Sequence, residues 1–260
     1  MMRTANPALN EKTFSQIGSF GAGATMTLQG TINKTFVLLI LLVISASWVW
    51  NKLMQPAPLM EGLEGPATQI SQTFAPLMMF GLVLGFVAGL VTIFKKAWSP
   101  VTAPVYALCE GLFIGGISAI FELNYPGIVV QAIALTFGTL FCLLMAYKSG
   151  MVKATENFKL GIVAATGAIC LIYLVSWVMS FFGASMPFIH DSGPWGIGFS
   201  LVVVTIAALN LVLDFDFIEH GSQMGLPRYM EWYAAFGLIV TLVWLYIEIL
   251  RLLSKLRDRR

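Results

Sequence analysis

Charge is scarce in this 260-residue chain, where 11% of the residues are charged and 58% are hydrophobic. The 15 basic and 13 acidic residues nearly balance, so the composition lacks the excess of positive charge that binding to nucleic acid requires. The mean hydropathy of +0.82 excludes an ordinary soluble domain. The composition therefore predicts an integral membrane protein.

Residues that carry enzyme and metal chemistry are also rare. There are two histidines, which disfavours a His-based metal site, and three cysteines that all lie in apolar runs without zinc spacing. We interpret Cys109, Cys142 and Cys170 as reduced packing residues. Ser118 lacks the G-x-S-x-G context of a serine nucleophile, and no phosphate-binding loop follows a strand. We therefore expect neither an enzyme nor a bound cofactor, and the sequence specifies no metal ligands.

Long hydrophobic runs are what the chain does have. Runs of roughly 17–25 residues, the length that spans a bilayer, recur along most of the sequence. They are continuous rather than alternating, which predicts helices and not a barrel, because backbone polar groups in lipid must be satisfied within the segment. The expected spans are 35–50, 74–94, 101–121, 127–147, 160–182, 195–216 and 233–253. The predicted domains are a flexible tail (1–34), a seven-helix transmembrane domain (35–253) and a short basic tail (254–260).

Lys and Arg near the ends of the spans predict the orientation. They gather in the N-terminal tail and in the loops after spans two, four and six, whereas the opposite loops have Lys52 alone. The N-terminus is therefore expected in the cytoplasm, with the protein in the plasma membrane, in bacteria the inner membrane. A seventh crossing would put Arg251 and the basic C-terminus outside, so the side of the C-terminus stays open.

Two spans carry glycines four residues apart. Gly81, Gly85 and Gly89 lie on one face of the second span, and Gly111 and Gly115 on one face of the third. Small residues at this spacing let helix backbones approach closely in lipid. Tight packing is the favoured interpretation, and a flexible hinge is the alternative.

Three acids stand in the segment LVLDFDFIE, at the end of the sixth hydrophobic run. A carboxylate at membrane depth costs at least ~2.5 kcal/mol and suggests a functional site. Asn210 and Asp214 are four apart and share a helical face, whereas Asp216 lies nearly opposite with Glu219 and His220. We predict that Asp214 points into the bundle and that Asp216 and Glu219 face loops or headgroups. The alternative is that Asp214 is a structural acid satisfied by neighbouring donors.

Further charges lie inside other spans. Glu110 sits in the middle of the third span without a basic residue in that span, so its partner must come from elsewhere, with Arg251 the candidate. Glu248 and Arg251 are three apart in the seventh span and can pair on their own helix. These three residues are predicted buried ion pairs. For Glu248 and Arg251 the alternative is that both charges reach out to the membrane interface.

Several segments together resemble a known family. They are RTANPALN (3–10), MTLQGTINKT (26–35), EGLFIGGIS (110–118), NYPGIVVQA (124–132), LDFDFIEHG (213–221) and EWYAAFGLIVTLVWLYIEILRLL (231–253). With them, the chain is similar to prokaryotic members of the transmembrane Bax inhibitor motif family, over nearly its whole length.

The resemblance implies a seven-helix bundle with the last helix central, and a calcium leak gated by pH-sensing acids on helices six and seven. Asp214 matches the helix-six acid, and Asp216 a polar position two residues further on. One alignment puts Thr241 where the helix-seven acid stands, and another puts Glu248 there. We prefer Thr241, because the ending ILR fits that alignment better. The Arg that latches the helix-six acid has no certain match, although Lys95 is close.

Two functions of different classes follow. The first is a pH-sensitive cation leak, calcium being the expected ion, with Asp214 as a buried, proton-sensitive latch and Asn210, Asp216 and Thr241 along the pathway. Desolvation and a nearby cation shift a carboxyl pKa in opposite directions, so such a latch can titrate near neutrality. The alternative is a non-transporting regulatory protein that binds a membrane protease or another membrane partner through its N-terminal tail.

Overall fold

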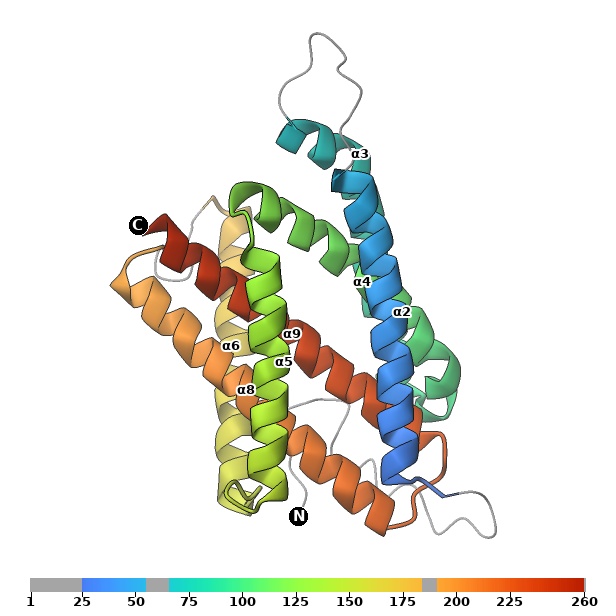
Figure 1. Cartoon of the computed structure of the whole chain (residues 1–260). Coiled ribbons are helices and arrows are strands. Elements are labelled where there is room, and N and C mark those ends of the chain that lie inside the picture. Colours follow the sequence, from blue (N-terminus) through green and yellow to red (C-terminus); the bar gives the residue numbers. More distant parts are fainter. Residues whose placement is uncertain (1–24, 55–65, 184–190, 260) are drawn as a thin grey trace. The chain divides into compact units, whose positions relative to one another are not determined.

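The computed structural model describes residues 25–54, 66–183 and 191–259, and its long elements are all α-helices (Figure 1). They are α2 (Leu28–Met54), α3 (Pro66–Phe94), α4 (Ser99–Asn124), α5 (Ile128–Lys148), α6 (Glu156–Phe181), α8 (Pro194–Gln223) and α9 (Met230–Asp258), with the 3-10 turn η1 (Lys96–Trp98) before α4. Within the described residues, seven helical segments are long and apolar enough to cross a membrane. The predicted all-α membrane fold with seven spans is confirmed.

The first and last spans extend beyond their expected bounds. The helix α2 begins at Leu28, before the expected start of the first span at residue 35, and residues 1–24 of the expected tail lie outside the described residues. Polar side chains do not end this helix, since the Thr31 and Thr35 hydroxyls donate to carbonyls four residues earlier. At the other end, α9 continues to Asp258, so most of the expected basic tail is helical.

The chain divides into two compact units, and α9 contributes to both. Among the described residues, unit 2 contains 25–54, 66–129 and 227–239, and unit 1 contains 130–183, 191–226 and 240–259. Of all the spans, α9 has the largest buried share, 67% of its most apolar window against 22% in α2, α5 and α6. Its burial fits the expectation of a central last helix, which stays a prediction.

In unit 2, α2 and α3 pack against α4 through glycines. A Cβ atom added at Gly115 would lie 2.8 Å from the Cα atom of Ala46 on α2, and one added at Gly81 would lie 2.7 Å from the carbonyl oxygen of Cys109. Neither position has room for a side chain. The predicted close approach of helix backbones at small residues is therefore confirmed.

Unit 1 is organised by a buried stripe on α6. Thr155 caps this helix by accepting a hydrogen bond from the Phe158 amide at 3.4 Å. The buried residues that follow are Lys159, Ile162, Thr166, Ile169 and Ser176, spaced to share one face. They lie on the side that packs against α8, whose segment 211–218 is buried throughout. The polar side chains of this stripe thus point inward, while apolar side chains of α6 such as Leu171 and Trp177 are exposed at the surface.

Candidate functional site

Asp214 lies in the interior of the protein. Its exposed fraction is 0%, and that of Asn210, one turn earlier on α8, is 3%. The Asn210 side-chain amide donates to the Thr166 hydroxyl on α6 at 2.9 Å and to the Ile206 carbonyl at 2.8 Å. The predicted inward position of Asp214 and Asn210 is confirmed, and Thr166 is a partner that the sequence did not reveal.

Asp216 does not face a loop or headgroups, and that prediction is wrong. Only 7% of the residue is exposed, and its Oδ2 atom lies 2.7 Å from the Lys159 ammonium group. Its Oδ1 atom lies 3.3 Å from Nδ1 of His220, one turn later on the helix. The predicted alignment of Asp216 with His220 is correct. The error arose because α8 continues to Gln223 and is covered on both faces, so acids on opposite faces are both buried.

Lys159 is the most important residue that we did not predict. It is one of the basic residues in the predicted loop after span four, but 5% of it is exposed and its side chain bridges α6 to Asp216 on α8. A second contact, to Glu156 at 3.6 Å, involves a carboxylate that is more than half exposed. The sequence holds a signal for this position, since Lys159 precedes Ile162 and Thr166 at spacings of three and seven, on the buried face of the helix.

Glu219 lies at the same end of unit 1. Its Oε2 atom accepts a hydrogen bond of 2.5 Å from the Tyr147 hydroxyl at the end of α5. The Tyr147 ring also contacts the Phe215 ring, with centroids 5.9 Å apart. The end of α5, the start of α6 and the end of α8 therefore meet in a charged group, which we call the Asp216 cluster: Tyr147, Lys159, Asp216, Glu219 and His220.

The predicted pair of Glu248 and Arg251 is present on α9. The Arg251 Nη1 atom donates to the two Glu248 carboxylate oxygens at 3.0 and 3.2 Å. Tyr173 of α6 completes the group, since its hydroxyl donates to Glu248 at 3.1 Å and accepts from Arg251 at 2.6 Å. The alternative of two charges at the interface does not describe Glu248, whose side chain is 3% exposed. Tyr173 was not predicted.

The other predicted site residues are buried too. Thr241 is 3% exposed in unit 1, and whether it or Glu248 stands for the helix-seven acid stays open. Glu110 is 8% exposed in unit 2, where a Cβ atom added at Gly85 of α3 would lie 3.4 Å from its Oε2 atom. The pairing of Glu110 with Arg251 of unit 1 stays a prediction. Lys95 lies over the Trp98 ring, 4.8 Å from its centroid.

Lys255 is a second buried cation that the sequence did not reveal. It is 4% exposed, and its ammonium group donates to the Gly196 carbonyl at 3.1 Å and to the Ser200 hydroxyl at 2.9 Å, both at the start of α8. Lys255 belongs to the predicted short basic tail (254–260). Polar partners on α8, and not its distance from the hydrophobic run, decide where this side chain lies.

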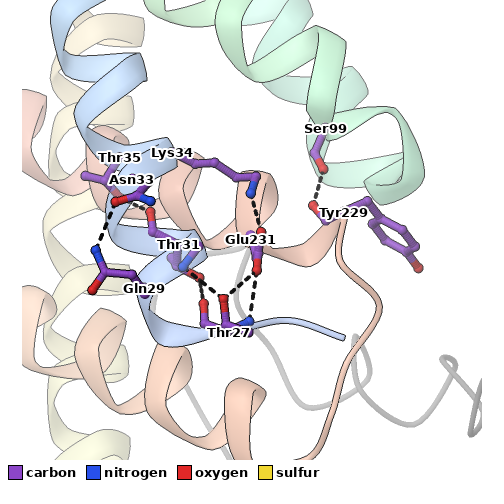
Figure 2. A network of polar contacts seen from close by, with 10 residues as sticks. Thr27, Gln29, Thr31, Asn33, Lys34, Thr35, Ser99, Tyr229 and Glu231 are labelled. Atoms are coloured by element: carbon purple, nitrogen blue, oxygen red, sulfur yellow. Dashed lines mark hydrogen bonds and ion pairs between the residues drawn. The ribbon is translucent and has the colours of Figure 1, made fainter. Parts of the chain in front are cut away.

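Unit 2 has its own buried carboxylate, Glu231 at the start of α9 (Figure 2). It accepts hydrogen bonds of 2.9 Å from the Thr27 amide and hydroxyl, and it forms an ion pair with Lys34. The neighbouring Tyr229 carbonyl accepts a bond of 2.8 Å from the Ser99 hydroxyl at the start of α4. Glu231 thus joins the beginnings of α2 and α9, and residues 27–34 belong to the fold.

Several of the groups described above are carboxylates paired with basic side chains, with neutral hydroxyl oxygen atoms nearby. Among the residues that the structure describes, no group of three or more His, Cys, Asp or Glu side chains could hold a metal ion. Asp216 has a basic partner in Lys159, and Glu248 has a basic partner in Arg251 and a hydroxyl donor in Tyr173.

Comparison with known proteins identifies the family. The model of the family described as Bax inhibitor 1 like matches residues 6–258, which is nearly the whole chain. Searches of curated proteins and of solved structures give no match. The family match covers every described helix and all the acids discussed above, as the motifs in the sequence predicted. The chain therefore belongs to the Bax inhibitor 1 like family of multi-pass membrane proteins.

Proposed function

We propose that this protein is a pH-sensitive cation leak, with calcium as the expected ion and Asp214 as its buried, proton-sensitive latch. The observation that carries the proposal is the complete burial of the Asp214 carboxylate in an apolar span. Placing a carboxylate there costs at least ~2.5 kcal/mol, which a protein tolerates where the charge serves a function.

Oxygen atoms near Asp214 on the same helix face support a cation pathway. Asn210 and its partner Thr166 place an amide and a hydroxyl one turn from Asp214, and Thr241 is a further buried hydroxyl in unit 1. Calcium takes six to eight oxygen ligands, which carboxylates, amides and backbone carbonyls supply. A path lined in this way would hold the ion only weakly and let it pass.

The Asp216 cluster supports the dependence on pH. Asp216 faces Lys159 and His220, and Glu219 faces Tyr147, so charged and titratable groups come from α5, α6 and α8. Protonation of a carboxylate in this group removes its attraction to Lys159. In the proposal, two factors together determine the cation flux at rest: whether Asp214 is protonated, and how strongly Lys159 attracts Asp216.

The test is calcium flux into liposomes containing the purified protein, at two pH values. We expect Asp214→Asn to abolish the difference between the two pH values. Asp191→Asn, the same change at an exposed position, should behave as the wild type does. A mutant Asp214→Asn whose flux and pH dependence equal those of the wild type would remove Asp214 from the mechanism.

The alternative, a regulatory protein that binds a membrane protease or another membrane partner, is tested by truncation. The truncation should remove residues 1–24 and keep 25–34, because Thr27 and Lys34 hold Glu231 and Met26 is 2% exposed. Lost partner binding with intact flux would support the regulatory function. Lost flux in a folded truncation would count against it.

A further inference from the structure

Three polar contacts, buried or part-buried, follow one face of α6 at a regular spacing. Lys159, Thr166 and Tyr173 follow one another at spacings of seven residues, so they share a face, with about 10.5 Å along the helix between successive members. Each contacts a polar side chain of α8 or α9 in the same unit: Asp216, Asn210 and Glu248, respectively. We call this series the α6 ladder. It links the Asp216 cluster to Glu248 through the contact between Thr166 and Asn210.

The contact at the far end of the α6 ladder is a closed triangle of Tyr173, Glu248 and Arg251. Every pair among these three side chains is joined by a hydrogen bond of 2.6–3.2 Å. The guanidinium group of Arg251 also lies over the Tyr173 ring, 5.1 Å from its centroid. Two carboxylate oxygens and one hydroxyl oxygen thus converge on a single positive charge.

The two charges of this triangle differ in exposure. The Glu248 side chain is 3% exposed, whereas that of Arg251 is 35% exposed. Arg251 stands one turn nearer the end of α9, and an arginine stem is long enough to carry its charged head outward while the stem stays packed. Lys159, the cation at the other end of the ladder, has a side chain only 6% exposed. Arg251 can therefore move away from the Glu248 carboxylate into solvent, whereas the buried Lys159 stays with Asp216.

We propose that Glu248 and Tyr173 form a second cation-binding site, in which the Arg251 guanidinium occupies the place of the cation in this conformation. The site suits a hard cation such as calcium, which prefers oxygen ligands. A buried Glu248 carboxylate without a positive partner would be costly in free energy. The cation must therefore bind Glu248 at the same time as Arg251 moves away. The proposal rests on the cation leak proposed above and adds an exchangeable internal counter-ion that keeps the resting flux low.

The first test is calcium flux into liposomes with Arg251→Gln. Loss of the internal competitor should raise the flux about tenfold, the change that about 1.4 kcal/mol of binding free energy produces. Arg257→Gln is the matched control, because it removes a positive charge from the same helix end, where Arg257 donates to the exposed Gln131 side chain and lies outside the Tyr173, Glu248 and Arg251 triangle. Equal flux in the wild type and both variants would overturn the proposal.

The second test measures binding directly, with Tb³⁺ as the probe and the full-length protein in detergent. Arg251→Gln should bind Tb³⁺ more tightly than the wild type, and the double variant Arg251→Gln/Glu248→Gln should lose that gain. If Arg251→Gln does not fold, Tyr173→Phe decides, since it removes one oxygen ligand and keeps the ion pair. Unchanged Tb³⁺ affinity in a folded Tyr173→Phe protein would then overturn the site.

The two tests separate this site from the leak itself. Absence of calcium flux in the wild type, together with tighter Tb³⁺ binding by Arg251→Gln, would reject the leak and keep the Glu248 site. Flux that depends on Asp214 but not on Arg251, with Tb³⁺ affinity unaffected by Arg251→Gln, would keep the leak and reject the Glu248 site.

Discussion

Unit 2 and unit 1 are built from helices of similar hydropathy, yet different contacts hold their helices together. In unit 2, α4 meets α2 and α3 where Gly115 and Gly81 bring backbones into contact. In unit 1, α6 meets its neighbours through side chains, as in the Lys159–Asp216 pair. The glycines of α6 take no part in this, because a Cβ atom added at Gly161 or Gly167 would meet nothing within 4 Å.

The glycine contacts of unit 2 contribute packing, whereas the polar contacts of unit 1 also carry groups that can react or bind. Backbones in contact at glycines gain from van der Waals packing alone and leave no polar group to exchange partners. Buried polar contacts are worth about 0.6–2 kcal/mol each in membranes, and each can be replaced by an ion or a proton. The buried polar contacts of α6 can therefore exchange partners, whereas the glycine contacts of α4 cannot.

The largest expected effect is on the buried ion pair of unit 1. Lys159→Met leaves the Asp216 carboxylate unpaired, and we expect a loss of about 3–5 kcal/mol of stability. The midpoint of thermal unfolding in detergent measures this. The double variant Lys159→Met/Asp216→Leu, which buries no charge, should recover most of the loss. A single variant as stable as the wild type would show that the pair is not buried.

The glycine contacts of unit 2 should come next. Gly115→Ala pushes a methyl group against the Ala46 backbone on α2, and overpacking of this kind costs about 1–3 kcal/mol. Gly167→Ala on α6 is the control: it has open space and should gain up to about 1 kcal/mol from better helix propensity. Opposite shifts of the unfolding midpoint are expected. Shifts of the same sign would contradict the assignment of glycine packing to unit 2.

A smaller effect is expected at the middle of the α6 ladder. Thr166→Val removes the acceptor of the Asn210 amide, which keeps its second bond to the Ile206 carbonyl. We expect a loss of about 0.5–1.5 kcal/mol, the usual value of one neutral hydrogen bond. If the ladder lines a cation path, calcium flux should fall as well. A loss of stability without any change in flux would make this contact structural only.

The smallest effect is expected at the rim of unit 1. Arg257 donates to the exposed Gln131 side chain at 3.2 Å. Because water and headgroups compete for such contacts, Arg257→Gln should change stability by no more than about 0.5 kcal/mol. A larger shift of the unfolding midpoint would mean that the cations at the end of α9 act as a group.

Hydrophobic run length was enough to predict the seven spans, because the bilayer sets the length of each helix. Helical phase was enough for Asn210, Asp214 and the Glu248–Arg251 pair, which lie on single helices. It failed for Asp216, because the fate of that side chain depends on a lysine of another helix. The periodicity of α6 can indicate that Lys159 is buried, but it does not identify Asp216 of α8 as its partner.

Glu231 and Lys255 have a mechanical consequence for α9. The first residue is bonded to Thr27 and Lys34 within unit 2, and the second to Gly196 and Ser200 within unit 1. A one-turn slide of α9 along its axis, about 5.4 Å, would break both sets of bonds at once. Piston motion of this helix is therefore disfavoured, and opening of the proposed leak would have to come from rotation or from side chains that change partners.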